Sequence, residues 1–474
     1  MVFSSIIFLG FFLPIAFGLY LLAPARYKNA VLAFVSIIFY AWGEPRFVFL
    51  MLLSVAFNYY AAQWQHRSTR PAWVLAAAVS VNLLLLGVFK YANFFVDNLN
   101  VVLSGLSMDP WVIWTIPLPI GISFYTFHAI SYLIDIRRQN AKPCQSIVDY
   151  SLYILFFPQL IAGPIVRYKD ISEQLIRREI SLSGLNEGIQ RFTMGLAKKV
   201  LIANQLALVA DAAFNAPAQT LDGGAAWLGL LCYTLQIYFD FSGYSDMAIG
   251  LARMFGFRFP ENFHYPYAAT SIQDFWRRWH MSLSTWFRDY VYVPLGGNRG
   301  GAVRTLVNLW LVFFLTGIWH GASWSFVIWG ALHGLFLSIE KGLANVSGVR
   351  LPLLIRRIYV WAVVMLAWVF FRCESAAQAG DYLAALTRPW TPQAWLQSST
   401  SLGPTQLASL LLVSCVLSLA FYPWLRTRLA GIWQWLQDRD LDGALRALLI
   451  MVALLLCLMS IALGQYNPFI YFRF

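Results

Sequence analysis

Charged residues are scarce in this chain of 474 residues. Only 12% of the residues are charged and 59% are hydrophobic, whereas roughly 25% are charged in an ordinary soluble domain. A soluble protein of this length has no interior large enough to hide so much apolar surface, so the composition excludes that class. The chain also lacks internal repeats, low-complexity tracts and any polar insert long enough for a separate soluble domain. We therefore expect one membrane domain over residues 1–474.

Cysteine and histidine are also few. The five cysteines are scattered without CxxC spacing, which predicts neither a disulfide framework nor a zinc knuckle. The six histidines show no paired spacing, which argues against a metal site. There is no P-loop, no HExxH and no GxGxxG after a strand. The run Gly243-Tyr-Ser245-Asp-Met247 lacks the last glycine of a serine-hydrolase elbow, so a hydrolase has little support.

Apolar residues gather into blocks, several of them about as long as the 20 residues that cross a bilayer. These blocks predict an all-α fold, a polytopic bundle of transmembrane helices. The first block lacks a clean cleavage site, so we expect a retained helix and not a signal peptide. Not every block needs to cross, because the short ones around 29–42 and 112–120 also suit re-entrant or surface helices. The candidate spans are 3–23, 29–42, 46–63, 72–89, 112–134, 147–166, 190–213, 224–251, 303–319, 322–343, 355–371, 407–424 and 443–464.

The basic excess lies in short loops between these spans. The formal net charge is +12, which by itself is also typical of nucleic-acid-binding proteins. Basic clusters in short loops instead indicate membrane topology and contact with anionic lipid head groups. We therefore expect no nucleic-acid partner.

The segment 253–301 is too polar to cross a bilayer and too aromatic for a disordered linker. Large apolar residues recur in it at spacings of three and four, which predicts an amphipathic helix at the membrane interface or in a polar cavity of the bundle. Those residues are Phe275, Trp279, Leu283, Trp286 and Tyr290. A second irregular stretch, 380–404, contains prolines and is expected to be a water-facing loop with short helices.

Ionisable residues within apolar spans are informative, because each costs a few kcal/mol at the bilayer centre unless it is paired or hydrated. Asp240 and Asp246 lie in the candidate span 224–251. One interpretation is that they anchor an arginine of the amphipathic segment, and the other is that they contact substrate. The arginines considered are Arg277, Arg278 and Arg288.

His280 ends the run Trp276-Arg-Arg-Trp-His280. The like charges of Arg277 and Arg278 are expected to lower the pKa of the imidazole, which favours the neutral form that a base requires. A structural histidine at an interface fits the same pattern, and the residues leave both interpretations open.

His320 lies between two apolar runs, with Gly317 and Gly321 around it. Small residues let helices or a substrate approach closely and let the chain bend at membrane depth, so we expect His320 to face a tunnel. His333 falls on a different helix face and is expected to pack behind the site. The run Gly296–Gly301 is interpreted either as a phosphate cradle or as a plain turn. A base in an apolar, arginine-flanked pocket suits acyl transfer, in which a histidine takes the proton from a hydroxyl that attacks a thioester.

Long motifs carry a resemblance to a known family. They are Asp274-Phe-Trp-Arg-Arg-Trp-His280-Met-Ser-Leu-Ser284, Tyr238-Phe-Asp-Phe-Ser-Gly-Tyr-Ser-Asp-Met247, Pro158-Gln-Leu-Ile-Ala-Gly-Pro164, Trp319-His320-Gly321, the start Met1-Val-Phe-Ser-Ser5 and the end Asn467-Pro-Phe-Ile-Tyr-Phe-Arg-Phe474. Together they resemble the membrane-bound O-acyltransferases, and within them the bacterial alginate O-acetyltransferase branch. The likeness spans essentially the whole chain.

The resemblance implies tilted transmembrane helices around a central chamber, with short interfacial or re-entrant helices. It implies that His320 is the catalytic histidine and His280 the supporting one. It further implies a bacterial inner-membrane enzyme that holds no bound cofactor and takes acetyl from a cytoplasmic donor, acetyl-CoA. A periplasmic partner of the SGNH acyltransferase kind would then place the acetyl group on a secreted polysaccharide such as alginate.

Six further residues are expected to bind substrate, namely Asp240, Asp246, Trp276, Arg277, Arg278 and Trp319. Two alternatives stay open. The first is transfer of another acyl group, such as D-alanyl, to a cell-wall polymer. The second is a transporter or flippase that makes no bonds, because transporters also keep carboxylates at membrane depth.

Overall fold

The computed structural model describes residues 1–346, 351–390, 403–419, 428, 430, 434, 441–464 and 466–468. Within these residues the chain is helical and contains no strand, which confirms the predicted all-α fold. Six helices are long and apolar enough to cross a membrane, and each overlaps a candidate span. The chain is therefore a multi-pass membrane protein. The six helices are Pro71–Gly105, Leu182–Asn215, Gly301–His320, Trp324–Leu343, Leu353–Arg372 and Asp442–Ala462.

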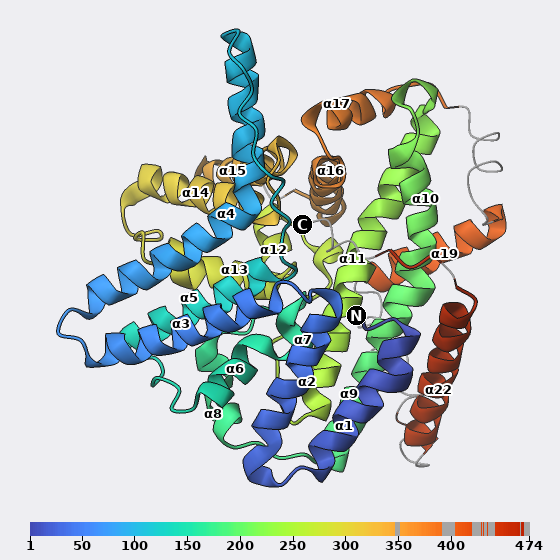
Figure 1. The fold of residues 1–474 in the computed structure, drawn as a ribbon. Helices are drawn as coiled ribbons and strands as arrows, with labels where there is room; N and C mark the ends of the chain where they lie inside the picture. Colours follow the sequence, from blue (N-terminus) through green and yellow to red (C-terminus); the bar gives the residue numbers. More distant parts are fainter. Residues whose placement is uncertain are drawn as a thin grey trace. The chain divides into compact units, whose positions relative to one another are not determined.

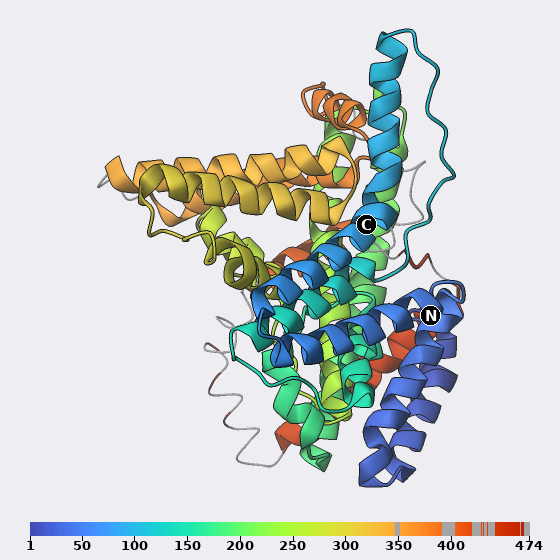
Figure 2. The same cartoon turned by 60° about the vertical axis from the view of Figure 1, so that its left-hand side comes forward.

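The chain divides into two compact units, and the first comprises Met1–Ile189 and Ala248–Pro260. Its central helix is α5, whose residues 122–133 are all buried, and α3 and α4 lie beside it (Figure 1). The C-terminal half of α4 projects beyond the rest of this unit (Figure 2). The elements of the first unit are η1 (Phe8–Phe12), α1 (Leu13–Leu22), η2 (Ala25–Tyr27), α2 (Lys28–Gly43), α3 (Val48–Arg67), α4 (Pro71–Gly105), α5 (Ile122–Arg137), α6 (Ile147–Leu155), α7 (Phe157–Leu160) and α8 (Tyr168–Ile176).

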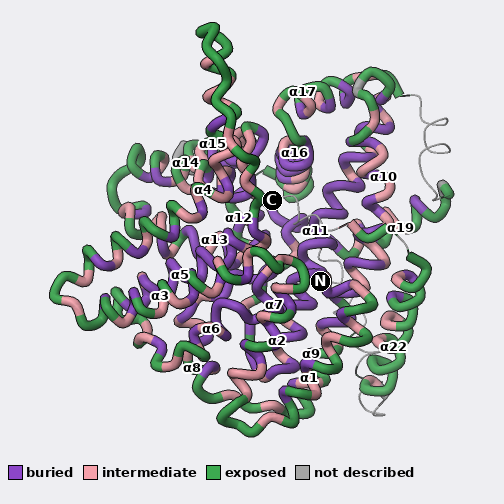
Figure 3. Tube along the Cα trace, viewed as in Figure 1, coloured by how far each residue is buried: buried purple, intermediate pink, exposed green. Residues whose placement is uncertain are grey.

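The second unit comprises Gln190–Met247 and Glu261–Phe474, and the residues of α9 (Leu182–Ala197) and α11 (Gly223–Met254) are divided between the two units. Residues 232–248 of α11 are all buried, and Figure 3 draws this helix in purple over most of its length. The polar groups of α11 therefore face protein. The other elements are η3 (Lys198–Ala203), α10 (Asn204–Asn215), η4 (Ala218–Thr220), η5 (Pro266–Ala268), α12 (Ile272–Trp276), α13 (Met281–Phe287), η6 (Arg288–Tyr292), α14 (Gly301–His320), α15 (Trp324–Val346), α16 (Leu353–Arg372), α17 (Ala376–Ala385), α19 (Pro404–Ser418) and α22 (Leu441–Ala462).

The predicted span 112–134 is wrong in its first half. Helix α5 begins only at Ile122, and residues 108–119 are not helical. Pro117 and Pro119 explain the difference, because neither can donate the backbone hydrogen bond that a helix needs. The expected re-entrant or surface helix at 112–120 is therefore absent. The expected loop at 380–404 begins within α17, and its residues 391–402 lie outside the described part of the chain.

The predicted span 147–166 is broken as well. Helix α6 ends at Leu155, and the short helix α7 begins at Phe157. Pro158 lacks the N–H group that would bond to the carbonyl of Ile154 in a continuous helix, so the chain turns at this point. The sequence contained Pro158 as a signal of this break, but the apolar run around it favoured one continuous span.

Helices α14 and α15 form an antiparallel hairpin whose backbones touch (Figures 1 and 2). A Cβ atom added at Gly330 would lie 2.4 Å from the carbonyl oxygen of Phe313, and one at Gly317 would lie 2.4 Å from that of Phe326. Glycine at both positions is what lets two membrane helices come this close. The contact fixes the C-terminal end of α14, which carries His320.

We expect Gly330→Ala to destabilise the protein by about 1–3 kcal/mol, the usual cost of overpacking a close contact. Gly342→Ala is the matched control, because it lies on the same helix and a Cβ there would meet no atom of the described residues within 4 Å. Thermal unfolding of the purified protein in detergent measures both. A melting temperature for Gly330→Ala equal to that of the wild type would contradict the backbone contact.

Candidate active site

The segment predicted as an amphipathic helix is interrupted at His280. His280 has φ +44°, in the left-handed region, and α13 begins only after it. Hydrogen bonds to the preceding loop replace helical ones at this bend, since the N–H of Met281 donates to the carbonyl of Asn262 at 2.9 Å. A continuous helix was therefore the wrong prediction, because the bonds that end it come from a residue far away in the sequence.

The side-chain amide of Asn262 holds this bend. Its Oδ1 accepts hydrogen bonds from the N–H of Ser282 at 3.2 Å and from the Ser282 hydroxyl at 2.9 Å, while its Nδ2 donates to Oγ of Ser245 at 3.0 Å. Because a backbone N–H is always a donor, Oδ1 is fixed as an acceptor. Nδ1 of His280 lies 3.1 Å from the same oxygen and must therefore carry its proton.

The neutral ring of His280 consequently has its lone pair on Nε2. His280 is 0% exposed, its ring meets that of Phe241 edge-on at 4.7 Å, and no group of the described residues bonds Nε2. Burial lowers the pKa of His280 to about 3, so the imidazole is neutral at physiological pH. The lowered pKa expected from the sequence is correct, but its cause is burial and not the neighbouring arginines.

His320 ends α14 and is 3% exposed. The ring centroids of Trp329 and Phe371 lie 5.1 and 5.0 Å from its imidazole, both steeply inclined to it. A Cβ atom at the following Gly321 would lie 2.1 Å from the ring of Phe326, so glycine is needed for this aromatic cluster to close around the histidine. His320 therefore sits in a dry, aromatic environment.

Trp319 is in contact with both histidines. Its ring centroid lies 4.9 Å from that of His320 and 6.2 Å from that of His280, and Trp319 is itself buried. The fold thus gathers two of the residues that the sequence analysis selected around the indole of a third, Trp319.

His333 packs behind this group, as predicted. It is buried between aromatic rings, and Trp276 donates its indole N–H to Nδ1 of His333 at 3.2 Å. The ring of Trp329 lies 5.0 Å from His333 and 5.1 Å from His320. Trp276 and Trp329 therefore connect the bend at His280 with the surroundings of His320.

Asp240 and Asp246 form ion pairs with the helix that precedes α11. Asp240 lies 2.9 Å from the Nζ of Lys199, and both side chains are nearly fully buried. Asp246 accepts from Lys198 at 2.6 Å and from Nε of Arg191 at 2.8 Å. The interpretation that these carboxylates anchor arginines of the amphipathic segment is therefore wrong, because their partners lie on the helix that precedes α11.

Close helix approach explains these pairs. A Cβ at Gly195 would lie 2.5 Å from the carbonyl oxygen of Gly243, so the two helices meet backbone to backbone. Lys198 and Lys199 begin η3, a π-helical stretch, and both reach carboxylates of α11. The sequence analysis missed both lysines, although two adjacent charges within an apolar run were a visible signal.

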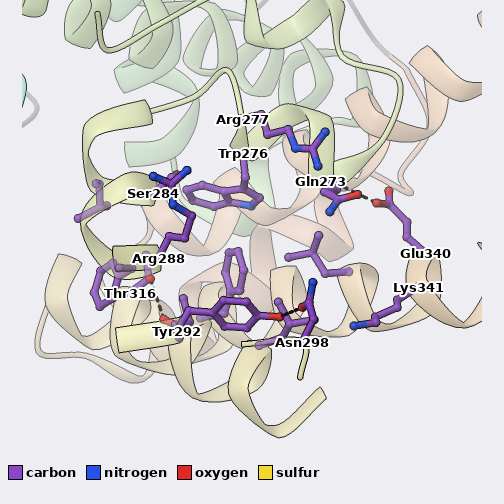
Figure 4. Close-up of a pocket in the computed structure, with 16 residues that line it drawn as sticks. Gln273, Trp276, Arg277, Ser284, Arg288, Tyr292, Asn298, Thr316, Glu340 and Lys341 are labelled. Atoms are coloured by element: carbon purple, nitrogen blue, oxygen red, sulfur yellow. Dashed lines mark hydrogen bonds between the residues drawn. The ribbon is translucent and has the colours of Figure 1, made fainter. Parts of the chain in front are cut away.

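A cavity of about 460 Å³ lies among α12, α13, η6, α14 and α15 (Figure 4). Trp276 and Arg277, two of the residues expected to bind substrate, line it, whereas Arg278 is paired with Asp274 at 2.9 Å. The sequence analysis did not select the cavity residues Glu340 and Lys341 of α15. The lining residues are Gln273, Trp276, Arg277, Leu283, Ser284, Phe287, Arg288, Tyr292, Asn298, Leu309, Val312, Phe313, Thr316, Leu337, Glu340 and Lys341.

Known proteins are similar to this chain over most of its length. A probable alginate O-acetylase AlgI of Azotobacter vinelandii is 46% identical over 425 residues, covering 88% of this chain and 84% of the relative. One of Pseudomonas putida is 41% identical over 499 residues and covers both chains completely. A peptidoglycan O-acetyltransferase of Helicobacter pylori is 36% identical over 419 residues, covering 80% of this chain and 78% of the relative.

The family model described as MBOAT, the membrane-bound O-acyltransferase family, matches residues 47–371, which include both histidines, Trp319 and the whole cavity. The match covers more than half of the chain, and the relatives extend it over nearly all of the remainder. The chain therefore belongs to the membrane-bound O-acyltransferase family.

Proposed function

We propose that this chain is an O-acetyltransferase of the bacterial inner membrane, which passes acetyl from a cytoplasmic donor for the O-acetylation of a secreted polysaccharide such as alginate. The observation that carries the proposal is a buried histidine, His320, surrounded by aromatic rings within a chain of this family. The names of its relatives support acetyl as the acyl group and alginate as the polymer. We also propose that residues 1–474 form one membrane domain, in which 253–301 carries part of the active site.

His320 acts as the general base in this proposal. It takes the proton from an acceptor hydroxyl as that oxygen attacks the thioester carbon, and the thiolate then leaves with a proton from the imidazolium. The C–S bond breaks, a C–O bond forms, and the histidine ends neutral. The aromatic surroundings support this role, because they shield the imidazole from bulk water.

His280 contacts the ring of Trp319, as His320 does, and supports the reaction from there. With Nδ1–H held by Asn262, its lone pair on Nε2 is available to accept a hydrogen bond from a reacting group. A neutral, fixed acceptor of this kind orients a hydroxyl without changing protonation itself. The ring of Trp319 contacts both imidazoles.

The remaining substrate-binding assignments are also proposals. Trp276 and Arg277 are supported by their position on the cavity wall. The ion pairs of Arg278, Asp240 and Asp246 support a role in positioning helices, and substrate contact by these three is still a prediction. The same ion pairs weaken the transporter alternative, since they account for the carboxylates that suggested it.

The donor and the partner are proposals as well. We propose acetyl-CoA as the cytoplasmic donor, because a histidine base suits attack on a thioester and no bound cofactor is required. A periplasmic protein of the SGNH acyltransferase kind completes the transfer to the polymer. The D-alanyl alternative differs only in the acyl group, and the acetylase names of the relatives favour acetyl.

We expect His320→Ala to lower acetyl transfer by at least about 100-fold, the usual contribution of a general base. The measurement is the acetyl content of the polymer from cells that carry each variant as their only copy. His66→Ala is the matched control, because His66 is an exposed histidine at the end of α3. Membrane insertion and melting temperature of both variants are compared with the wild type, and normal acetylation by a folded His320→Ala protein would refute the proposal.

Asn262 is a positioning residue that a pH profile can test. We expect Asn262→Asp to raise the pKa of His280, because a carboxylate beside Nδ1 stabilises the imidazolium. The wild-type pKa of about 3 leaves activity independent of this group near neutrality, whereas the variant should lose activity as pH falls through the raised pKa. Asn262→Ala should lower kcat at every pH. A profile for Asn262→Asp that coincides with the wild type would contradict the assigned hydrogen bond.

A further inference from the structure

Helix α4 is longer than a bilayer crossing requires. Its 35 residues extend over roughly 52 Å, whereas the hydrocarbon core of a bilayer is about 30 Å thick. The average tilt of a membrane helix, about 20°, lengthens the crossing only to roughly 32 Å, and the apolar run 72–89 accounts for it. Residues 91–105 of α4 and the chain that returns from its tip, 106–119, form a projection beyond the core, which we call the arm (Figure 2).

The basic residues on either side of the arm indicate that it is periplasmic. Arg67 and Arg70 precede α4, and three basic residues follow α5 within 137–142. Between these clusters, residues 91–136 contain neither lysine nor arginine. Short loops rich in lysine and arginine stay in the cytoplasm. The loops before α4 and after α5 are therefore cytoplasmic, and the arm, which joins the other ends of these two packed helices, lies on the opposite side.

Two asparagines fasten the returning chain to the helix. Nδ2 of Asn93 donates to the carbonyl of Ile116 at 2.8 Å, and its Oδ1 accepts from the N–H of the same residue at 3.1 Å. Asn100 makes the same pair of bonds with Trp111, at 3.0 and 2.7 Å. Asn93 and Asn100 are about two helical turns apart and so share one face of α4. The returning chain covers that face, which fixes the arm as one structure.

The other face of the arm helix presents an apolar stripe. Its members recur at spacings of four, three and four, the pattern by which two packed helices bury a seam. They are Phe95, Leu99, Val102 and Leu106. At about 100° per residue, the stripe lies roughly 140° around the helix from the two asparagines. Phe95, Val102 and Leu106 are 62%, 58% and 65% exposed, and Figure 3 draws the end of this helix mostly in green. An apolar seam exposed beyond the bilayer core indicates a partner helix.

The charge of the arm favours one kind of occupant. Asp97 and Asp109 are the only charged residues within 91–119, which gives the arm a formal charge of −2 in a chain of +12. Anionic phospholipid head groups and a second copy of the arm carry the same sign and are repelled, whereas a helix flanked by lysine or arginine is attracted. The occupant that fits is therefore an amphipathic helix with an apolar seam and basic surroundings.

We propose that the arm is the docking site for such a helix of the periplasmic protein that receives the acyl group, with Phe95, Val102 and Leu106 as its apolar contacts. The proposal rests on the proposed function for the need of that protein and adds the surface that holds it. Trp111 and Trp114 of the returning chain are also exposed, the second at 93%. Tryptophan is enriched both at protein interfaces and at the bilayer surface, so the experiments separate a protein occupant from lipid.

Equilibrium binding of the purified SGNH-type protein of the same bacterium to the full chain in detergent tests the stripe. Val102→Glu should weaken binding roughly tenfold or more, because it removes a buried valine from the seam and adds a charge there. Ser104→Glu is the matched control, since Ser104 is exposed on the face of the asparagines and gains the same charge. Wild-type binding by Val102→Glu, or equal weakening by both variants at wild-type melting temperature, would overturn the proposal.

Labelling in spheroplasts identifies what covers the stripe. In cells without the SGNH-type protein, Val102→Cys and Ser104→Cys should both react with a membrane-impermeant maleimide, above the background of the wild type with its five cysteines. In cells that contain it, Val102→Cys should be protected and Ser104→Cys should react as before. Protection of Val102→Cys without the protein would assign the stripe to lipid or to a second copy. Failure of both positions to react would place the arm elsewhere than the periplasm, and either result overturns the proposal.

Acetylation of the polymer in cells separates this proposal from the one it rests on. His320→Ala should bind the SGNH-type protein as the wild type does while the polymer stays unacetylated, and Val102→Glu should lose both binding and acetylation. If His320→Ala abolishes acetylation but Val102→Glu keeps both, the docking proposal fails alone. If Val102→Glu loses both but a folded His320→Ala protein still supports acetylation, the proposed function fails alone.

Discussion

One buried amide, that of Asn262, holds the geometry around His280 together. A single oxygen atom accepts from an imidazole, a hydroxyl and a backbone N–H, and the same side chain donates to Ser245 of α11. Each of these groups is buried, and a buried donor left without an acceptor costs about 1–3 kcal/mol. The same side chain therefore sets three features at once, namely the bend in the chain, the tautomer of the ring and the attachment to α11.

The second unit keeps two different environments close together. The surroundings of His320 are aromatic, whereas three cations line the cavity among α12, α13, η6, α14 and α15. Trp276 connects the two, because its ring lines the cavity and its N–H donates to His333 behind it.

Sequence reasoning found what depends on composition and local pattern. Long uncharged runs predicted the six apolar helices, and histidines flanked by small or aromatic residues in apolar runs predicted the residues that meet at Trp319. It missed what depends on distant contacts. The bend at His280 is fixed by Asn262, 18 residues earlier, and the partners of Asp240 and Asp246 follow from a contact between two glycine backbones. Neither feature changes the spacing of apolar residues along the chain, which is the pattern that predicts helices.

The π-helical stretch η3 sets the rotation of everything that follows it in the same continuous helix. Such a stretch arises when one residue is inserted into an α-helix, and each residue of an α-helix turns the chain by about 100°. Two consecutive lysines begin this stretch and reach two carboxylates of α11. Removing one residue would turn α10 by the same angle, so that its buried residues would no longer face their present neighbours. The length of this run is therefore constrained even where its residue types are not.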